Sequence, residues 1–495
     1  AAPFNSSRGT SLINRNSVYT VYCDVTGRKW IGTLRGGINL VETSEPFFRH
    51  ILYKGNDGNN KVDNFILSFC EDGQHNLYIG TDCAGLRYWD RHRNDYKLYR
   101  NDPGNPASIS SNFITNIIRD DRQDTWISTW FGGVNRLRKN SSHFERFALY
   151  NPSTGAYEAN VWLVYEDKYK NIWAGATNDG SLYLFDRKRG RFELFDPSIV
   201  SLQSIAEDRE GNFWGGNYTS LIRIDRTYKK HIIYSIGHTV RCIKEDSKGR
   251  FWLGTQDGGL LLFDRSSGRY RQFTTSDGLP GNTILRILED KAGNLWMSTY
   301  NGLVRFDPDT YACNNFTQSD GLQSNQFSFN GSLALSSGEF IFGGINGFNI
   351  FYPDSVSVPK DNTAVFLTGI KVDNKPLPMA GHLTLPFDRS SLSLDFVALD
   401  YSAADKIKYA YMLQGWDKTW NYVDKGRTAS YSRLQEGAYV FMVKICRSDG
   451  SWSKPARLLE IKILPPWYRT WWAYALFGLT ASAFVIGYIK YARRQ

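Results

Sequence analysis

The sequence contains few of the residues that catalytic and metal-binding proteins bring together. Its 495 residues include only six cysteines and seven histidines, and no two histidines have the spacing of a metal site on one element. The GxSxG motif of hydrolases and the phosphate-binding P-loop are both missing. Six cysteines are also too few to define a disulfide framework in so long a chain. We therefore expect no metal, no cofactor and no catalytic residue in this region.

Long runs of like charge are missing as well. The chain has 59 Lys and Arg against 49 Asp and Glu, a formal net charge of +10. The basic residues are scattered, which is typical of a solvated surface and gives no indication of a nucleic-acid site. A basic protein attracts anionic ligands, acidic or sulfated sugars among them. Prolines number only 16, whereas 44 glycines and 15% aromatic residues indicate short strands joined by tight turns.

Only one stretch is long and apolar enough to cross a membrane, at residues 471–489. Aromatic residues precede it and basic residues follow it, as at the two faces of a bilayer: Trp467, Tyr468, Trp471 and Trp472, then Lys490, Arg493 and Arg494. Positive residues stay cytoplasmic, so we expect a single pass through the inner membrane with residues 1–465 in the periplasm. A buried core helix is the alternative. Residues 1–15 do not form a signal peptide, so we expect either that a signal has been removed or that the chain is an excerpt of a longer protein.

A motif of about 45 residues recurs through the first 350 positions. Eight copies are centred on aromatic anchors, namely Trp30, Tyr78, Trp126, Trp173, Trp214, Trp252, Trp296 and Phe342. Each copy has an apolar strand, an acidic turn with glycine, the anchor strand, a second glycine turn and two further strands, which is one blade of a β-propeller. We favour seven blades, with one copy left over from a preceding ring, and an eight-bladed ring is the alternative. The anchors are expected to pack between blades.

Paired carboxylates recur at the first turn of successive copies, as in Glu166-Asp167, Glu207-Asp208 and Glu289-Asp290. A position that repeats in every blade indicates a structural role, so we interpret these residues as turn caps. A glycosidase would need two carboxylates that converge at one place.

The repeat ends before residues 363–464, where alternating segments are typical of an immunoglobulin- or fibronectin-like β-sandwich. The chain is therefore predicted to be all-β, with a propeller over residues 1–357, a sandwich over 358–466, and a membrane helix with the start of a cytoplasmic linker over 467–495. Pro465 and Pro466 join the sandwich to the helix and stiffen that junction.

Two segments resemble known families. The series Tyr409-Ala-Tyr411 to Trp416-Asp417, with Tyr431 and Tyr439, resembles the triple-tyrosine (Y_Y_Y) domain, and the blades resemble two-component-regulator propeller repeats. In this order they resemble the periplasmic sensor half of Bacteroides-type hybrid two-component systems. The resemblance implies recognition of a glycan-derived oligosaccharide, a homodimer, and control of polysaccharide-utilisation genes through a histidine kinase beyond this region. The chain departs from the family in having eight repeats, where about fourteen are common, and no kinase.

The second glycine turns vary in sequence while the scaffold repeats, as expected of function carried on loops. They are predicted to bind the ligand around one channel mouth through Arg35, Asp82, Trp130, Asn178, Asp179, Tyr218, Gln256, Asp257, Tyr300 and Asn346. Aromatic rings stack on sugars, and the polar side chains hydrogen-bond hydroxyls. Arg35 and Trp130 are the favoured individual residues, and an acidic oligosaccharide is the first ligand to test. A propeller-based lyase or glycosidase and an adhesion or scaffold module are the alternatives.

Overall fold

The computed structural model describes residues 17–24, 29–41, 47–53, 64–177, 180–356, 364–387, 391–399, 408–423, 426–446 and 452–493. The chain divides into two compact units, Ala1–Ser357 and Val358–Gln495. Both units consist of β-sheets, apart from one long C-terminal helix and a few 3-10 turns. The 3-10 turns are η2 (Thr275–Asp277), η3 (Gln318–Asp320), η4 (Pro353–Ser355) and η5 (Trp467–Arg469).

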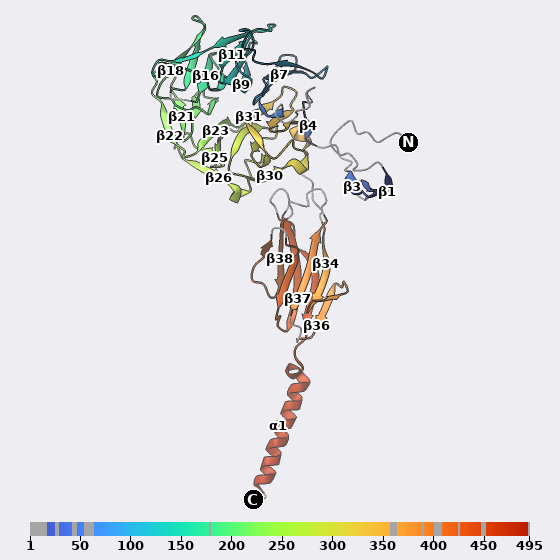
Figure 1. The fold of residues 1–495 in the computed structure, drawn as a ribbon. Helices are drawn as coiled ribbons and strands as arrows, with labels where there is room; N and C mark the ends of the chain where they lie inside the picture. The colour runs from blue at the N-terminus through green and yellow to red at the C-terminus, as the bar shows by residue number, and fades with distance from the viewer. Residues whose placement is uncertain are drawn as a thin grey trace. The chain divides into compact units, whose positions relative to one another are not determined.

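The first unit contains a ring of seven four-stranded antiparallel sheets among its described residues (Figure 1). Blade 1 consists of β5 (Ile66–Glu71), β6 (Leu77–Thr81), β7 (Leu86–Asp90) and β8 (Asp95–Tyr99). Blade 2 consists of β9 (Phe113–Arg119), β10 (Thr125–Trp130), β11 (Gly133–Leu137) and β12 (Phe144–Phe147). Blade 3 consists of β15 (Val161–Glu166), β16 (Ile172–Ala176), β17 (Leu182–Asp186) and β18 (Arg191–Asp196). A hairpin of β13 (Leu149–Asn151) and β14 (Ala156–Glu158) lies between blades 2 and 3 in the sequence.

Blades 4 to 6 continue the same order of strands. Blade 4 consists of β19 (Ser204–Glu207), β20 (Phe213–Gly216), β21 (Ser220–Ile224) and β22 (Ile232–Ser235). Blade 5 consists of β23 (Thr239–Glu245), β24 (Phe251–Gln256), β25 (Leu260–Phe263) and β26 (Tyr270–Phe273). Blade 6 consists of β27 (Ile284–Glu289), β28 (Leu295–Thr299), β29 (Gly302–Phe306) and β30 (Cys313–Phe316). The first strand of each blade is the innermost, and most of these inner strands contact the inner strand of the next blade.

Blade 7 closes the ring with a strand from the other end of the unit. It consists of β31 (Phe327–Ala334), β32 (Phe340–Gly344), β33 (Gly347–Phe351) and β4 (Arg49–Ile51), and β4 pairs antiparallel with β33. The inner strand β31 then contacts β5 of blade 1. The preference for seven blades is confirmed. The closing strand comes from residues 49–51, for which the repeat pattern predicts no separate strand.

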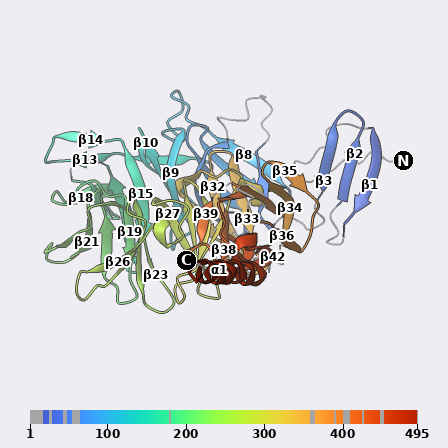
Figure 2. The same ribbon diagram turned by 90° about the horizontal axis from the view of Figure 1, so that it is seen from below.

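The first motif copy forms a sheet of its own (Figure 2). It consists of β1 (Val18–Cys23), β2 (Lys29–Thr33) and β3 (Gly37–Val41), and no described strand of the ring pairs with it. Trp30 Nε1 donates to Asp24 Oδ2 at 3.1 Å, the same bond that the anchors of the ring make. This first copy is therefore blade-like without being part of the seven-bladed ring.

In the five blades with a tryptophan anchor, the acidic turn and the anchor are joined by a hydrogen bond. Asp246 accepts the backbone N–H groups of Lys248 (3.0 Å) and Arg250 (2.9 Å), which folds the turn, and also Nε1 of Trp252 (2.9 Å). The same 2.9 Å bond joins Trp126, Trp173, Trp214 and Trp296 to the aspartate six residues earlier. The predicted turn-capping role of these aspartates is confirmed.

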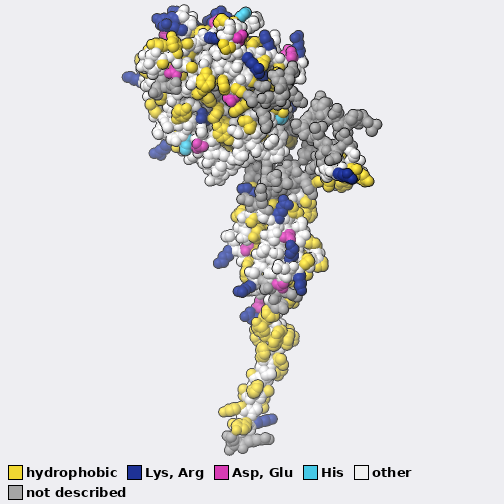
Figure 3. Space-filling view, in the orientation of Figure 1, with side chains coloured by type: hydrophobic (Ala, Val, Ile, Leu, Met, Phe, Trp, Pro, Cys, Tyr) yellow, Lys and Arg dark blue, Asp and Glu magenta, His cyan; other side chains and the backbone are white. Residues whose placement is uncertain are grey.

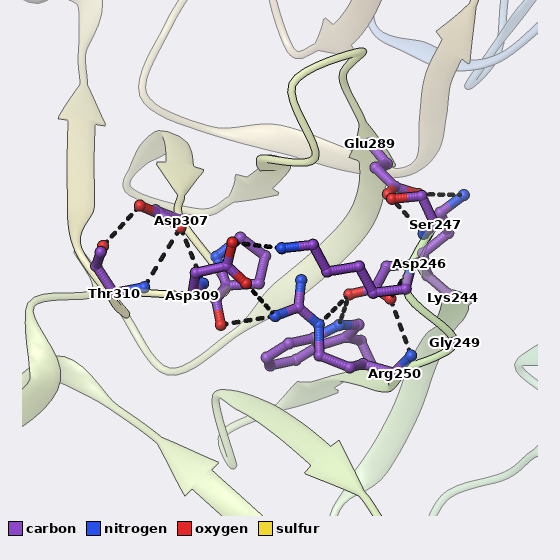
Figure 4. Close-up of polar contacts among 12 residues, drawn as sticks. Lys244, Asp246, Ser247, Gly249, Arg250, Glu289, Asp307, Asp309 and Thr310 are labelled. Atoms are coloured by element: carbon purple, nitrogen blue, oxygen red, sulfur yellow. Dashed lines mark hydrogen bonds and ion pairs between the residues drawn. The ribbon is translucent and has the colours of Figure 1, made fainter.

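In five blades a glutamate precedes the turn aspartate, and it joins neighbouring blades. Glu289 of blade 6 accepts the backbone N–H of Ser247 in blade 5 at 2.6 Å (Figure 4). Glu166, Glu207 and Glu245 make the same bond to the turn of the preceding blade, and Glu71 makes it to Ser336 of blade 7. The sequence therefore identified the turn but not the link between blades.

Each anchor packs against the blade that follows it. Trp252 of blade 5 is fully buried among Leu295, Met297 and Phe306 of blade 6. Trp296 of blade 6 packs in the same way against blade 7, in one cluster with Phe342. Because the aromatic residues fill the spaces between blades, the ring contains a series of small cores, as the repeat predicts.

The second unit holds a two-sheet sandwich and a helix. One sheet has the order β35 (Lys375–Leu377), β34 (Val365–Val372), β37 (Ser391–Ala398) and β40 (Thr428–Ser432); the other has β36 (His382–Leu385), β42 (Ala456–Ile463), β41 (Gly437–Cys446), β38 (Lys408–Gln414) and β39 (Asn421–Val423). Their inner faces share one core that includes Phe396, Tyr409 and Phe441. Tyr431 Oη donates to Asp417 Oδ2 at 2.8 Å and Tyr439 Oη donates to the carbonyl of Gln435 at 2.9 Å, so tyrosines of the triple-tyrosine motif also hold loops in place.

The helix α1 (Trp471–Ala492) is long and apolar enough to cross a membrane. Hydrophobic side chains cover most of its visible surface (Figure 3), and almost none of it is buried inside the protein. Lys490 is the basic residue of its last turn. An exposed apolar surface of this length is what a bilayer would cover.

Candidate functional site

Five inner strands of the ring carry a β-bulge near their start. In β5, β9, β15, β23 and β27 the pairing register skips one residue, and the skipped residues are Leu67, Thr115, Trp162, Arg241 and Leu285. A bulge leaves its extra residue out of the ladder and redirects the side chain. At this end of the inner strands, the side chains of Leu67, Thr115 and Leu285 are buried, whereas those of Trp162 and Arg241 keep part of their surface exposed.

Arg241 is the centre of a polar cluster at this end of the channel. Its guanidinium donates to Gln256 Oε1 at 3.1 and 2.5 Å and to Gln203 Oε1 at 2.6 Å, and it lies 4.5 Å from the centre of the Phe329 ring. Burial lowers the pKa of Arg241. None of these partners is a carboxylate, so the positive charge of Arg241 is available to a ligand.

Two of the predicted tyrosines and one aspartate lie near this guanidinium. Tyr300, Tyr218 and Asp257 are close enough to act on it electrostatically, and they partly offset the effect of burial on its pKa. Tyr218 is 50% exposed and Tyr300 is 38% exposed, so both hydroxyls can reach a ligand in solvent. Asp257 is held by Thr283, whose hydroxyl lies 3.3 Å from its Oδ1.

A strip of aromatic rings extends from this cluster. The ring of Tyr300 lies 6.0 Å from Phe329, Phe329 lies 5.5 Å from Trp162, and Trp162 lies 6.2 Å from Trp130. Phe131 follows at 6.2 Å from Trp130 and is 64% exposed. We name these five residues the aromatic strip. Its members come from blades 2, 3, 6 and 7, so the strip crosses the channel.

The inner strand β31 carries Phe329 of the strip. Its pairing with β32 is interrupted between Phe327 and Ser332, and Asn330 of this irregular segment reaches past blade 1 to blade 2. Asn330 Nδ2 donates to the carbonyl of Thr115 in blade 2 at 3.0 Å, and its side chain is buried. The strip and the Arg241 cluster thus form a floor on which a ligand could lie.

The ten predicted ligand residues divide into three groups. Tyr218, Gln256, Asp257 and Tyr300 surround Arg241, and Trp130 lies in the strip. Asp82 and Asn346 lie on their predicted turns: Asp82 is half-buried and burial raises its pKa, while Asn346 is fixed to Gln323 by two bonds of 2.9 and 3.1 Å. Arg35 lies in the turn between β2 and β3 of the separate sheet, and Asn178 and Asp179 lie outside the described residues.

Sequence reasoning missed the residues on the inner strands. Arg241, Trp162, Gln203 and Phe329 lie on or beside those strands rather than on the glycine turns. A signal for two of them existed, because this position changes chemistry from Thr115 to Trp162 to Arg241 while the residue before it stays apolar and β-branched. A column that varies inside a constant frame indicates a functional position.

A groove of about 930 Å³ lies between blades 4 and 5 and is rich in arginine. Two of its arginines, Arg265 and Arg250, are already in ion pairs. Arg265 bonds Asp208 at 2.9 Å and Glu245 at 3.0 Å, and Arg250 bonds Asp246 at 2.5 Å and Asp309 at 2.8 Å (Figure 4). These ion pairs tie turns together, and we therefore place the candidate site at the channel mouth instead.

The turn aspartates make the stability of the ring sensitive to acid. Burial alone would raise the pKa of Asp208, but hydrogen bonds from Trp214, Asn212 and Arg265 outweigh it and lower the pKa. Hydrogen bonds lower the pKa values of Asp167 and Asp246 in the same way. A carboxyl whose pKa is lowered by folding stabilises the fold above its unfolded pKa of about 3.9, and that contribution is lost as the pH falls through the folded value.

We expect urea midpoints to be constant from pH 7 to about 5 and to fall steeply below pH 4. A midpoint that stays constant to pH 3 would contradict these bonds.

Two families match parts of the chain. Residues 400–464 match the Y_Y_Y domain, and residues 235–257 and 278–301 match the two component regulator propeller. The second match covers the β23–β24 and β27–β28 regions, on which the repeat was recognised. The chain therefore carries two-component-regulator propeller repeats and a triple-tyrosine domain, and this prediction is confirmed.

The chain is also similar to a histidine kinase and to solved extracellular domains. It is 25% identical to histidine kinase P4 of Formosa agariphila over 552 aligned positions, which cover 97% of this chain and 37% of that protein. The crystal structure of the extracellular domain of a putative hybrid two component system from B. thetaiotaomicron superposes with a TM-score of 0.77 at 25% identity, over 91% of this chain and 62% of that one. A second such extracellular domain from that organism superposes with a TM-score of 0.55 at 23% identity, over 94% of this chain and 65% of that one, and shows the fold alone. The chain thus spans less than two thirds of the length of each of these relatives.

Proposed function

We propose that this chain is the ligand-sensing region of a membrane-anchored hybrid two-component sensor, and that it recognises an oligosaccharide. The order of propeller, triple-tyrosine domain and apolar helix supports this proposal, together with the similarity to a histidine kinase and to an extracellular sensor domain. The helix anchors the chain in the inner membrane, with the propeller and sandwich on the periplasmic side. The basic residue after the apolar stretch supports that orientation.

One observation carries the choice of ligand. The aromatic strip and the Arg241 cluster meet at the same end of the channel, sharing Tyr300 and Phe329. Aromatic faces stack on the apolar faces of sugar rings, while amides, hydroxyls and a guanidinium bond the sugar oxygens. Among the described residues Arg241 makes hydrogen bonds only to amide oxygens, and Asp257 acts on it electrostatically without a hydrogen bond. This guanidinium favours an acidic sugar over a neutral one.

Signalling requires the ligand to bind two arrangements of the receptor with different affinity. The sandwich lies next in the chain to α1, and Pro466 and η5 make the junction short. We propose that the receptor is a homodimer that meets through the sandwich, and that the ligand changes the relative placement of the two copies. The helix then transmits that change to a histidine kinase, which controls polysaccharide-utilisation genes. Light scattering with and without ligand tests this step, and a monomer throughout contradicts it.

Trp130→Ala tests the site. Wild-type protein is first titrated by calorimetry with a panel of neutral, uronic-acid and sulfated oligosaccharides. The variant is expected to bind the best of these about 10-fold more weakly, because it loses one stacking ring at the exposed part of the strip. Arg35→Ala, on the separate sheet, shows whether that sheet contributes to binding. An unchanged affinity for Trp130→Ala would rule out the mouth, and release of shortened sugars during the titration would indicate an enzyme instead.

A further inference from the structure

A guanidinium without a protein partner lies inside the ring. Arg286 is on β27, the inner strand of blade 6, directly after the bulge at Leu285. Within the described residues its side chain makes no hydrogen bond and no ion pair, and the one group that acts on it electrostatically is Cys242. The side chain is deep enough for burial to lower its pKa, yet it keeps part of its surface accessible.

An unused hydroxyl lies beside it. Ser298 on β28 is directly opposite Arg286 in the antiparallel pair, so the two side chains lie on the same face of the sheet. The Oγ of Ser298 is buried and has no hydrogen-bond partner among the described residues. Two donors that are each unsatisfied therefore lie next to each other on one pair of strands.

Blade 2 shows how the ring satisfies these positions elsewhere. There Ser128 on β10 is opposite Asn116 on β9, and Ser128 Oγ accepts from Thr115 at 2.9 Å and donates to the carbonyl of Asn116 at 3.3 Å. Blade 5 has the small pair Cys242 and Gly254 at the same register. Only blade 6, among the described blades, combines a cation with a hydroxyl here and leaves both without partners.

The neighbouring acidic groups cannot serve as the missing partner. Glu289 is bound to Ser247 at 2.6 Å and to Lys244 at 3.5 Å (Figure 4), and Asp290 holds its own turn and Trp296. Burial raises the pKa of the Cys242 thiol to about 12, so this group stays neutral at pH 7. A buried charge with no counter-charge strongly disfavours folding unless something else compensates it.

We propose that Arg286 and Ser298 form an oxyanion site inside the propeller, which takes a sulfate or carboxylate group. A planar guanidinium binds such groups through two parallel hydrogen bonds, and the hydroxyl supplies a third donor. The group can come from a free anion or from the acid substituent of a sugar. A free anion can fill this site with no oligosaccharide present, so its test does not depend on the proposed sugar ligand.

Thermal unfolding of the full chain in detergent tests the site. Sodium sulfate at 10 mM, compared with sodium chloride of equal ionic strength, is expected to raise the Tm by about 2 °C if that concentration is about ten times Kd. Sodium glucuronate, with glucose as the neutral control, tests the sugar source. The shift is expected to vanish in Arg286→Met, which keeps the length of the side chain but loses its charge, and to shrink in Ser298→Ala. The matched control is Arg122→Met, at an exposed position, and it should retain the wild-type shift.

Each outcome decides for or against the site. A shift with sulfate alone identifies a free-anion site, and a shift with glucuronate but not with glucose identifies the acid group of a sugar. No shift of the wild type with either anion overturns the proposal. A Tm shift in Arg286→Met as large as that of the wild type also overturns the proposal, because it would reflect general salt stabilisation. If Arg286→Met does not fold, a Tm shift in Ser298→Ala as large as that of the wild type overturns it for the same reason.

Discussion

Trp252→Ala is expected to lower the free energy of unfolding of the ring by about 3–5 kcal/mol. The indole is fully buried between blades 5 and 6, where it contacts Phe306 with ring centres 5.7 Å apart. The substitution leaves a cavity that a β-sheet on each side cannot close. It also removes the 2.9 Å bond to Asp246, whose buried carboxylate then loses one of its donors.

Urea unfolding followed by far-UV circular dichroism measures this loss. Trp252→Phe should fall between wild type and alanine, because it keeps most of the packing but not the hydrogen bond. Trp130→Ala is the matched control, since this half-buried tryptophan lies at the mouth rather than between blades, and we expect a change of about 1 kcal/mol or less. Equal losses at Trp252 and Trp130 would contradict the division of the tryptophans into structural and ligand-binding sets.

Arg241→Ala is expected to weaken binding of an acidic oligosaccharide about 30-fold, or ~2 kcal/mol. Binding of its neutral counterpart should weaken much less, because the guanidinium is the cation of the cluster and its protein partners are uncharged amides. Calorimetry with the two sugars measures the difference. Arg241→Lys keeps the charge and loses the paired hydrogen bonds, so its affinity should lie between those of wild type and alanine.

Weaker binding of the acidic sugar must be distinguished from destabilisation of the variant. Arg241→Ala leaves Gln203 and Gln256 without their partner, so its melting temperature is measured beside the titration. Arg271→Ala removes an exposed arginine from the outer strand β26 and serves as the matched control, with unchanged affinity expected. If both sugars lose affinity equally in Arg241→Ala, the guanidinium does not select acidic ligands.

Much of the fold could be predicted because each blade repeats the same local chemistry. The aspartate, the glycine and the anchor lie within one turn and two strands, so their spacing in the sequence determines their hydrogen bonds. Two features depend on contacts between distant segments. Glu71 binds Ser336 of the last blade, and β4 joins β33 across almost 300 residues. A repeat pattern contains no information about which distant segment closes the ring.

The site was predictable in part for the same reason. Glycine turns mark where loops occur, and they led to Tyr218, Gln256 and Tyr300. Arg241 and Trp162 lie within strands that look like ordinary core strands, and their departure from the scaffold depends on a bulge that appears only in the pairing register. Phe329 and Asn330 reach the centre through the irregular segment of β31, which no period in the sequence reveals.

Hydroxyl-radical footprinting with the best oligosaccharide of the panel tests the central claim most directly, because it locates binding without any substitution. The account predicts that the ligand protects Trp130, Trp162 and Tyr300 from oxidation. Tyr157 and Tyr228, which are 69% and 79% exposed and belong neither to the aromatic strip nor to the Arg241 cluster, should react at the same rate with and without it. Protection of Tyr157 or Tyr228 with no change at Trp130, Trp162 and Tyr300 would contradict the account.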